Sequence, residues 1–228
     1  MSVAIEGSVG SVAIGAASST WDLTGMVVTA GNLLIAVVAY DAAARSGTSV
    51  TWDPTGANQG ATKIATKTES PDFGTVELWG LKTPTAGTAT VRVAVAGGAT
   101  VGVLGAYSLT GVDTSIAFAS YSQGTQNGIQ PTDPAISGLT AAAGDLTLDG
   151  YVEGVATTET MTVGGSQTTG FNLNAALGTS SGGSSSKAAG TSMSWTANTL
   201  DSWAYLAVVI PGSVTGAASG IVLILKHV

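Results

Sequence analysis

Hydrophobic residues occur along this chain in short blocks that are separated by residues typical of turns. The clearest blocks are residues 32–40, 76–81, 88–95, 101–109, 145–152 and 203–210. They are rich in β-branched residues and are shorter than an average helix, which favours strands. Within 88–95, Val91, Val93 and Val95 alternate with Arg92 and Ala94, so the valines share one face of a strand. The pattern predicts an all-β protein with very little helix.

Block 32–40 is almost entirely apolar, which is typical of a central strand that is buried on both faces. Turn formers such as Asp53-Pro54 and Gly97-Gly98 lie between the predicted strands. The spacing of strands and turns predicts a two-sheet antiparallel β-sandwich. No fixed-period repeat is visible. Residues 174–177 are a weak candidate for a helical turn, and the Ser/Gly run at 179–186 is predicted to be a mobile loop.

The chain is expected to hold one sandwich domain over residues 1–212, followed by a tail over 213–228. The tail starts with small residues, as a linker does, and then becomes strongly apolar. Its apolar segment is predicted to be an assembly arm that adds a strand to a neighbouring subunit. An intramolecular edge strand is the equal alternative. The arm consists of Ile221, Val222, Leu223, Ile224 and Leu225.

Composition narrows the classes of function. The 228 residues include no cysteine and one histidine, and only 9% are charged, so disulfides and thiolate metal sites are excluded. The net charge is −7 and the basic residues are scattered, which argues against nucleic acid as a partner. No apolar run approaches the roughly 20 residues that span a bilayer, and the start lacks the features of a signal peptide. We expect a soluble protein with no membrane partner.

Several strings, in their order along the chain, are similar to those of a known family. They are Gly31-Asn32-Leu33-Leu34-Ile35, Val50-Thr51-Trp52, Val76-Glu77-Leu78-Trp79, Pro84-Thr85-Ala86-Gly87-Thr88-Ala89-Thr90-Val91, Ser108-Leu109-Thr110-Gly111-Val112-Asp113, Ala143-Gly144-Asp145-Leu146 and Ser202-Trp203-Ala204. Together they resemble a broad group of concanavalin-like jelly-roll proteins, which are frequent among bacteriophage virion proteins and bacterial surface proteins. The resemblance covers about residues 20–212. It implies a jelly roll and a role in capsid decoration, a head fibre or tail adornment, and it transfers no catalytic residue.

Paired carboxylates are the first candidate for chemistry, because a glycosidase needs two acids about 5 to 10 Å apart. Glu77 is alone on its predicted strand. Asp145, Asp149 and Glu153 recur at a spacing of four, which we do not expect to build such a pair. We therefore predict no catalytic residue and no enzymatic activity.

Oxygen ligands for calcium are the second candidate. Asp41, Asp113 and Asp145 lie at the ends of predicted strands and could share a rim. Aspartate is also a common turn residue, and this second interpretation is favoured. No cofactor or metal site is predicted, with calcium as a weak alternative.

Exposed aromatic rings on a sandwich can stack on sugars, although most large rings fill cores. Trp52, beside a predicted turn, is the best candidate for sugar stacking, and Tyr40 is a weaker one. The sequence as a whole predicts a non-enzymatic structural protein of a virion surface, assembled in the host cytoplasm. Its partners would be copies of itself or other virion proteins. A carbohydrate-binding adhesion module, with a glycan as partner, is the alternative.

Overall fold

The computed structural model describes residues 1–42, 48–69, 74–98, 100–129, 132–154, 161–175, 180–196 and 202–213. In this part of the chain the strands are joined by antiparallel pairing, and the one helical element is a 3₁₀ turn, η1 (Phe118–Ser120). The prediction of an all-β sandwich with very little helix is confirmed. Within the same residues no helix has the length and apolar character needed to cross a membrane.

The first half of the chain forms two sheets that pack face to face. The inner sheet has the order β1-β10-β4-β8-β7, with β2 also paired to β10, and the outer sheet has the order β3-β9-β5-β6. The strands are β1 (Ala4–Ile5), β2 (Gly10–Ser18), β3 (Thr20–Val28), β4 (Leu33–Tyr40), β5 (Ser49–Trp52), β6 (Gln59–Gly60), β7 (Thr62–Thr68), β8 (Thr75–Lys82), β9 (Gly87–Ala94) and β10 (Thr100–Thr110).

The second half forms another pair of sheets. Its inner sheet has the order β11-β18-β13-β16-β15, and its outer sheet has the order β12-β17-β14. The strands are β11 (Gln123–Ile129), β12 (Ala135–Ser137), β13 (Leu146–Gly154), β14 (Thr162–Val163), β15 (Thr168–Asn174), β16 (Ser180–Ala188), β17 (Ser192–Thr196) and β18 (Ser202–Ile210).

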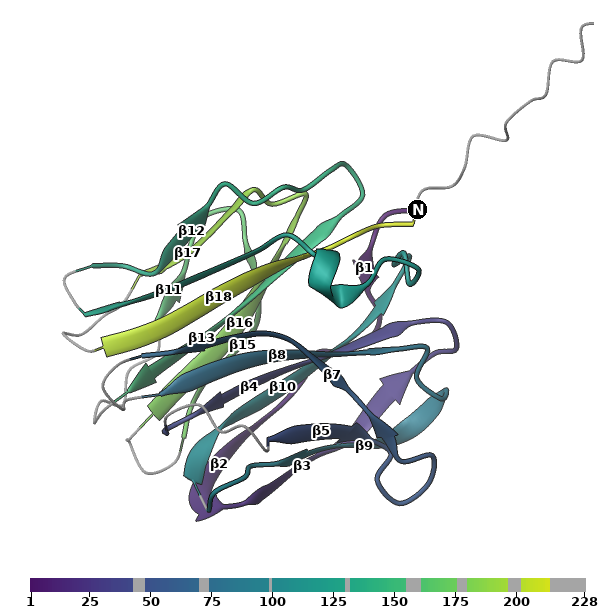
Figure 1. Ribbon diagram of the computed structural model, residues 1–228, viewed down its shortest axis with the longest axis horizontal. Coiled ribbons are helices and arrows are strands. Elements are labelled where there is room, and N and C mark those ends of the chain that lie inside the picture. The colour runs from purple at the N-terminus through teal and green to yellow at the C-terminus, as the bar shows by residue number, and fades with distance from the viewer. Residues whose placement is uncertain are drawn as a thin grey trace, which may run out of the picture.

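The two inner sheets pack on each other, so the molecule has four layers where two were expected. Figure 1 shows them stacked, with β12 and β17 at the top and β3, β5 and β9 at the bottom. The reason lies in the inner strands. Every residue of β4 is buried, as predicted, and β18 is buried from its second residue onward. A strand that is apolar on both faces needs a covering layer on each side.

The two halves repeat one strand order. If the strands of the first half are numbered 1 to 8 from β2 to β10, with β6 left out, the inner sheet has the order 1-8-3-6-5 and the outer sheet has the order 2-7-4. Numbered from β11, the second half has the same two orders. Short strings echo this repeat: Gly31-Asn32-Leu33 and Gly144-Asp145-Leu146 both lead into the third strand. The repeat could not be seen in the sequence, because the two halves share the order of their strands while the side chains at most equivalent positions differ.

Three hydrophobic cores lie between the four layers. The central core joins the inner sheets through residues such as Val37, Val103 and Leu206. The first outer core contains Trp21, Trp52, Trp79 and Tyr40, between the sheets of the first half. The second outer core contains Trp195, Trp203, Tyr151, Tyr205 and two methionines, between the sheets of the second half.

The Ser/Gly run that was predicted to be a loop is the interior strand β16, and this prediction was wrong. The strand lies between β13 and β15, and its small residues are required by what faces them. A Cβ on Gly183 would lie 2.5 Å from the ring of Tyr151, and the Oγ atom of Ser184 is 2.7 Å from the hydroxyl of Tyr107. At 174–177, Asn174 ends β15, and residues 176–177 lie outside the described part of the chain.

The two ends of the described chain meet at one pole of the molecule. The amino group of Met1 donates to the carbonyl oxygen of Ser213, and Val3 N donates to Gly144 O at 2.8 Å. Val112 and Gly212, which follow the last strand of each half, form an isolated bridge. The proposed boundary at residue 212 stays a prediction, because residues 214–228 lie outside the described part.

Candidate functional site

The tryptophans lie in the outer cores. Trp52 is 1% exposed and donates from its indole nitrogen to Thr85 O at 2.9 Å. Tyr40 is 0% exposed, and its hydroxyl is 3.1 Å from Glu77 Oε1. A ring enclosed in this way offers no face to a sugar. The sugar-stacking prediction for these two residues is therefore corrected. Tyr40, on β4, is covered by the outer sheet of the first half, and Trp52, on β5 of that outer sheet, points inward into the core between the two sheets.

Two acids are fully buried on the outer faces of the inner sheets. The first is Glu77, on β8. Its Oε1 atom accepts from Lys63 Nζ at 2.5 Å, and its Oε2 atom accepts from Trp79 Nε1 at 2.9 Å. The side chain of Lys63 is 29% exposed and that of Glu77 is 0% exposed, so the lysine brings a counter-charge in from the sheet edge. The ammonium also lies 4.9 Å from the centroid of the Trp79 ring.

The second buried acid is Asp149, on β13. Its Oδ2 atom accepts from Trp195 Nε1, Tyr205 Oη and Ser185 Oγ, each at 2.8 Å. Ser185 N donates to Oδ1, and Gln167 Nε2 lies 3.4 Å from Oδ2. Burial raises the pKa of Asp149 to about 6, while the hydrogen bonds from Tyr205, Ser185 and Trp195 act in the opposite direction.

The two acids do not form a catalytic pair. Glu77 faces the first outer core and Asp149 faces the second, so the central core and both inner sheets separate them. Each acid is enclosed by the indole and phenol groups that it anchors. Both acids were rejected as catalytic candidates on the sequence alone. A spacing of four does place Asp149 and Glu153 on one face of β13. Glu77 and Asp149 therefore serve as acceptors for buried hydrogen-bond donors. Their surroundings leave no room for a substrate.

The three aspartates that were considered for calcium lie at different ends of the strands. Asp113 follows β10 and Asp145 precedes β13, at the pole that holds the N-terminus. Asp41 follows β4 at the opposite end of the sheet. The expected shared rim is therefore absent, since strands of this length separate the groups. The described residues contain no cluster of three or more His, Asp or Glu side chains with metal-binding geometry.

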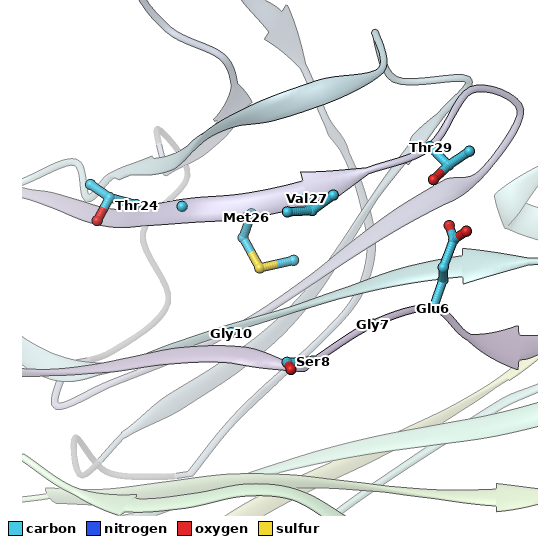
Figure 2. A pocket seen from close by; sticks show the side chains of 9 residues that line it. Glu6, Gly7, Ser8, Gly10, Thr24, Met26, Val27 and Thr29 are labelled. Carbon is cyan, nitrogen blue, oxygen red and sulfur yellow. The ribbon is translucent and has the colours of Figure 1, made fainter.

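An open cleft that the sequence analysis missed lies at an edge of the first half. Its volume is about 450 Å³, and it separates the β1–β2 connection from β3. Figure 2 shows Glu6 and Thr29 at one end, Met26 and Val27 along the middle, and Thr24 at the other end. Glu6 is the one titratable side chain among the residues that line the cleft. The hydrophobic pattern of the sequence gives no sign of this cleft, because each of its walls is formed where a strand of otherwise ordinary pattern is irregular.

The predicted assembly arm, Ile221 to Leu225, lies outside the described residues. Its role stays a prediction that rests on the sequence.

No protein-family model, no curated protein and no solved structure matches this chain. The resemblance to phage jelly-roll proteins and the jelly-roll assignment itself therefore stay predictions, while the all-β sandwich rests on the strands described above.

Proposed function

We propose that this protein is a non-enzymatic structural subunit that acts by assembling with copies of itself and with other proteins on the surface of a particle. The observation that carries the proposal is how the buried acids are used. Glu77 and Asp149, the fully enclosed carboxylates of the two outer cores, are each occupied by indole and phenol donors. The carboxylates that could act as catalytic acids thus stabilise the packing of the two outer cores.

The assembly part of the proposal rests on the tail. Residues 221–225 are uncharged and strongly β-prone, and such a segment gains stability when it pairs with a sheet edge. A bacteriophage virion surface is the proposed setting, supported by the residue strings that resemble phage jelly-roll proteins. The alternative of a carbohydrate-binding module is disfavoured, because both of its candidate rings, Trp52 and Tyr40, lie in the first outer core.

The test is the oligomeric state of the full chain, measured by size-exclusion chromatography with multi-angle light scattering. We expect the wild type to exceed the monomer mass of 22.3 kDa. Leu223→Asp places a charge in the centre of the apolar arm, where pairing would bury it at a large cost, and should give a monomer. Ser219→Asp adds the same charge in the linker and should leave the assembly unchanged.

A wild type that is monomeric at tens of micromolar, or a Leu223→Asp variant that assembles as the wild type does, would contradict the proposal.

A further inference from the structure

We infer that the cleft between the β1–β2 connection and β3 is a docking site for a lysine side chain of a partner protein. The inference concerns a surface of the described body and is independent of the proposed role of the arm. Its basis is the shape of the cleft, the single negative charge in it, and a comparison with the equivalent position in the second half.

The cleft is held open by irregularities on both of its walls. β1 and β2 pair with the same strand, β10. Glu6 N still donates to Ser108 O of β10 at 2.8 Å, and residues 7–9 then leave the sheet before β2 begins. On the facing wall, the register of β3 with β9 shifts between Leu23 and Met26. Gly7 and Gly25 have φ angles of +71° and +76°, and a Cβ at either would meet no atom within 4 Å. Both glycines therefore face open space, and bulges of this kind are common beside functional sites.

The floor of the cleft is aliphatic. Met26 is 4% exposed and lies over Gly10, where a Cβ would come within 2.5 Å of its Sδ atom. The neighbouring Val27 is 62% exposed, which is unusual for a large apolar side chain of this molecule. Met26 and Val27 are consecutive in β3 and point to opposite faces of the strand, so Met26 lies at the back of the cleft and Val27 at its outer rim. A methionine thioether adapts to the shape of a ligand.

The charged end of the cleft is fixed in place. Glu6 Oε2 accepts from the amide of Asn32, which also donates to Ser108 Oγ at 2.8 Å. Asn32 and Ser108 are 3% and 1% exposed, so a buried amide orients an exposed carboxylate. The ion pairs among the described residues do not include Glu6. Figure 2 shows its carboxylate directed toward Thr29, so a carboxylate and a hydroxyl converge at this end.

A lysine side chain matches these features better than other ligands do. Its ammonium has three donors and no acceptor, and it would find acceptors in the outer oxygen of Glu6 and in hydroxyls such as those of Thr29 and Ser8. Its methylene stem would lie along the β3 wall, between Val27 at the rim and Met26 at the back of the cleft. The protein carries a net charge of −7, which favours a cation, and the lining has no aromatic ring on which a sugar would stack.

The second half provides an internal control, because the equivalent first and second strands are β11 and β12. The cleft between them has a volume of about 280 Å³ and is lined by uncharged residues. Gln126 Oε1 accepts from Ala135 N at 2.9 Å and thereby bridges the two strands. The fold therefore accommodates a smaller and neutral cleft at this position. Among the described residues, a cleft with an acid occurs at this position of the repeat in the first half, and the equivalent cleft of the second half carries no charge.

The test uses the full chain with ¹³C-methyl methionine, in which the Met26 signal is assigned by Met26→Leu. The signals of Met161 and Met193, which are buried in the second outer core, report folding in the same spectra. The probes are N-acetyl-lysine-N-methylamide, its neutral analogue N-acetyl-norleucine-N-methylamide, and maltose. We expect the lysine probe to shift the Met26 signal saturably, and to bind more weakly when NaCl rises from 20 to 300 mM.

Glu6→Gln keeps an acceptor for Asn32 but removes the charge, and should weaken the lysine probe at least threefold. Ser8→Lys supplies an ammonium at the cleft and should abolish binding of the probe. The inference is overturned if the neutral analogue binds as well as the lysine probe, if Glu6→Gln binds as the wild type does, or if maltose alone saturates the site.

Discussion

The two halves of the molecule share a strand order but satisfy their buried tryptophans in different ways. In the first half Ala36 is paired with Trp79, and in the second half Asp149 is hydrogen-bonded to Ser185 on the neighbouring strand β16. Ala36 and Asp149 occupy the same position of the repeat, five residues after Gly31 and Gly144. In the first half the acid is instead Glu77, on the strand that carries the tryptophan.

The comparison shows that each outer core requires a buried acceptor for an indole, while the strand that supplies it is free to vary. The consequences differ in electrostatics. Glu77 has a lysine beside it, whereas the hydrogen-bond partners found for Asp149 are neutral donors. An acid without a counter-charge must be stabilised by the number of its donors, and its neutral form is favoured by burial.

The largest effect is expected from Asp149→Ala. The change leaves the indole of Trp195, the hydroxyl of Tyr205 and the amide of Ser185 buried without their acceptor. Each unsatisfied group costs about 1–3 kcal/mol, so the free energy of unfolding should fall by about 4 kcal/mol. Urea denaturation, followed by tryptophan fluorescence, measures it.

Asp113→Ala is the control for this change, because Asp113 accepts from the backbone and hydroxyl of its neighbour Ser115 in an exposed turn. It should leave the urea midpoint almost unchanged. A comparable loss in both variants would mean that Asp149 has no special part in the second outer core.

Removal of the counter-charge in the first half comes next. Lys63→Met keeps the length of the side chain but leaves Glu77 buried without a cation. Breaking a buried pair costs about 3–5 kcal/mol, and the partial exposure of Lys63 reduces the expected loss to about 2–3 kcal/mol. Lys187→Met, at a lysine that donates to Ser192 O at 3.3 Å, should cost much less in the same denaturation experiment. Equal losses would remove the distinction between the two halves.

The pH dependence of stability gives the smallest effect. Because the folded pKa of Asp149 is raised to about 6 from its ordinary value of 3.8, the folded state holds a proton that the unfolded state releases between these values. This contribution is complete below pH 3.8 and is lost as the pH rises through 6. It amounts to about 2 kcal/mol between pH 4.5 and 7.5.

The measurement compares wild type with Asp149→Asn, which does not titrate, in urea at both pH values. The difference in unfolding free energy between the two proteins should be about 2 kcal/mol larger at pH 4.5. Parallel pH profiles would show that the hydrogen bonds to Asp149 outweigh its burial.

Several features of the fold followed from local pattern. The alternation of Val91, Val93 and Val95 with Arg92 predicted which face of β9 is buried, and all three valines lie in the first outer core. The almost entirely apolar block at 32–40 predicted a strand covered on both faces. Both inferences use the two-residue period of a strand, which a sequence displays directly.

The candidate site was beyond the sequence. Glu6 and Asn32 are 26 residues apart, and they meet because β1 and β4 both pair with β10. In the sequence, Asp149 stands four residues from Asp145 and Glu153, a spacing that predicts no catalytic pair and carries no sign of the hydrogen-bond partners of Asp149. Those partners lie on β15, β16, β17 and β18 or the turns beside them, and they meet only after the second half has folded.

The sequence by itself determined that this chain makes strands, where most of them lie, and that its tryptophans go inside. These properties depend on neighbours a few residues away. The tertiary structure alone decided that there are four layers, that a run of serines and glycines is an interior strand, and that an open acidic cleft remains at one edge. In each case the deciding contact is with a distant strand: small residues of β16 face the rings of Tyr107 and Tyr151, and burial of a strand depends on what covers it.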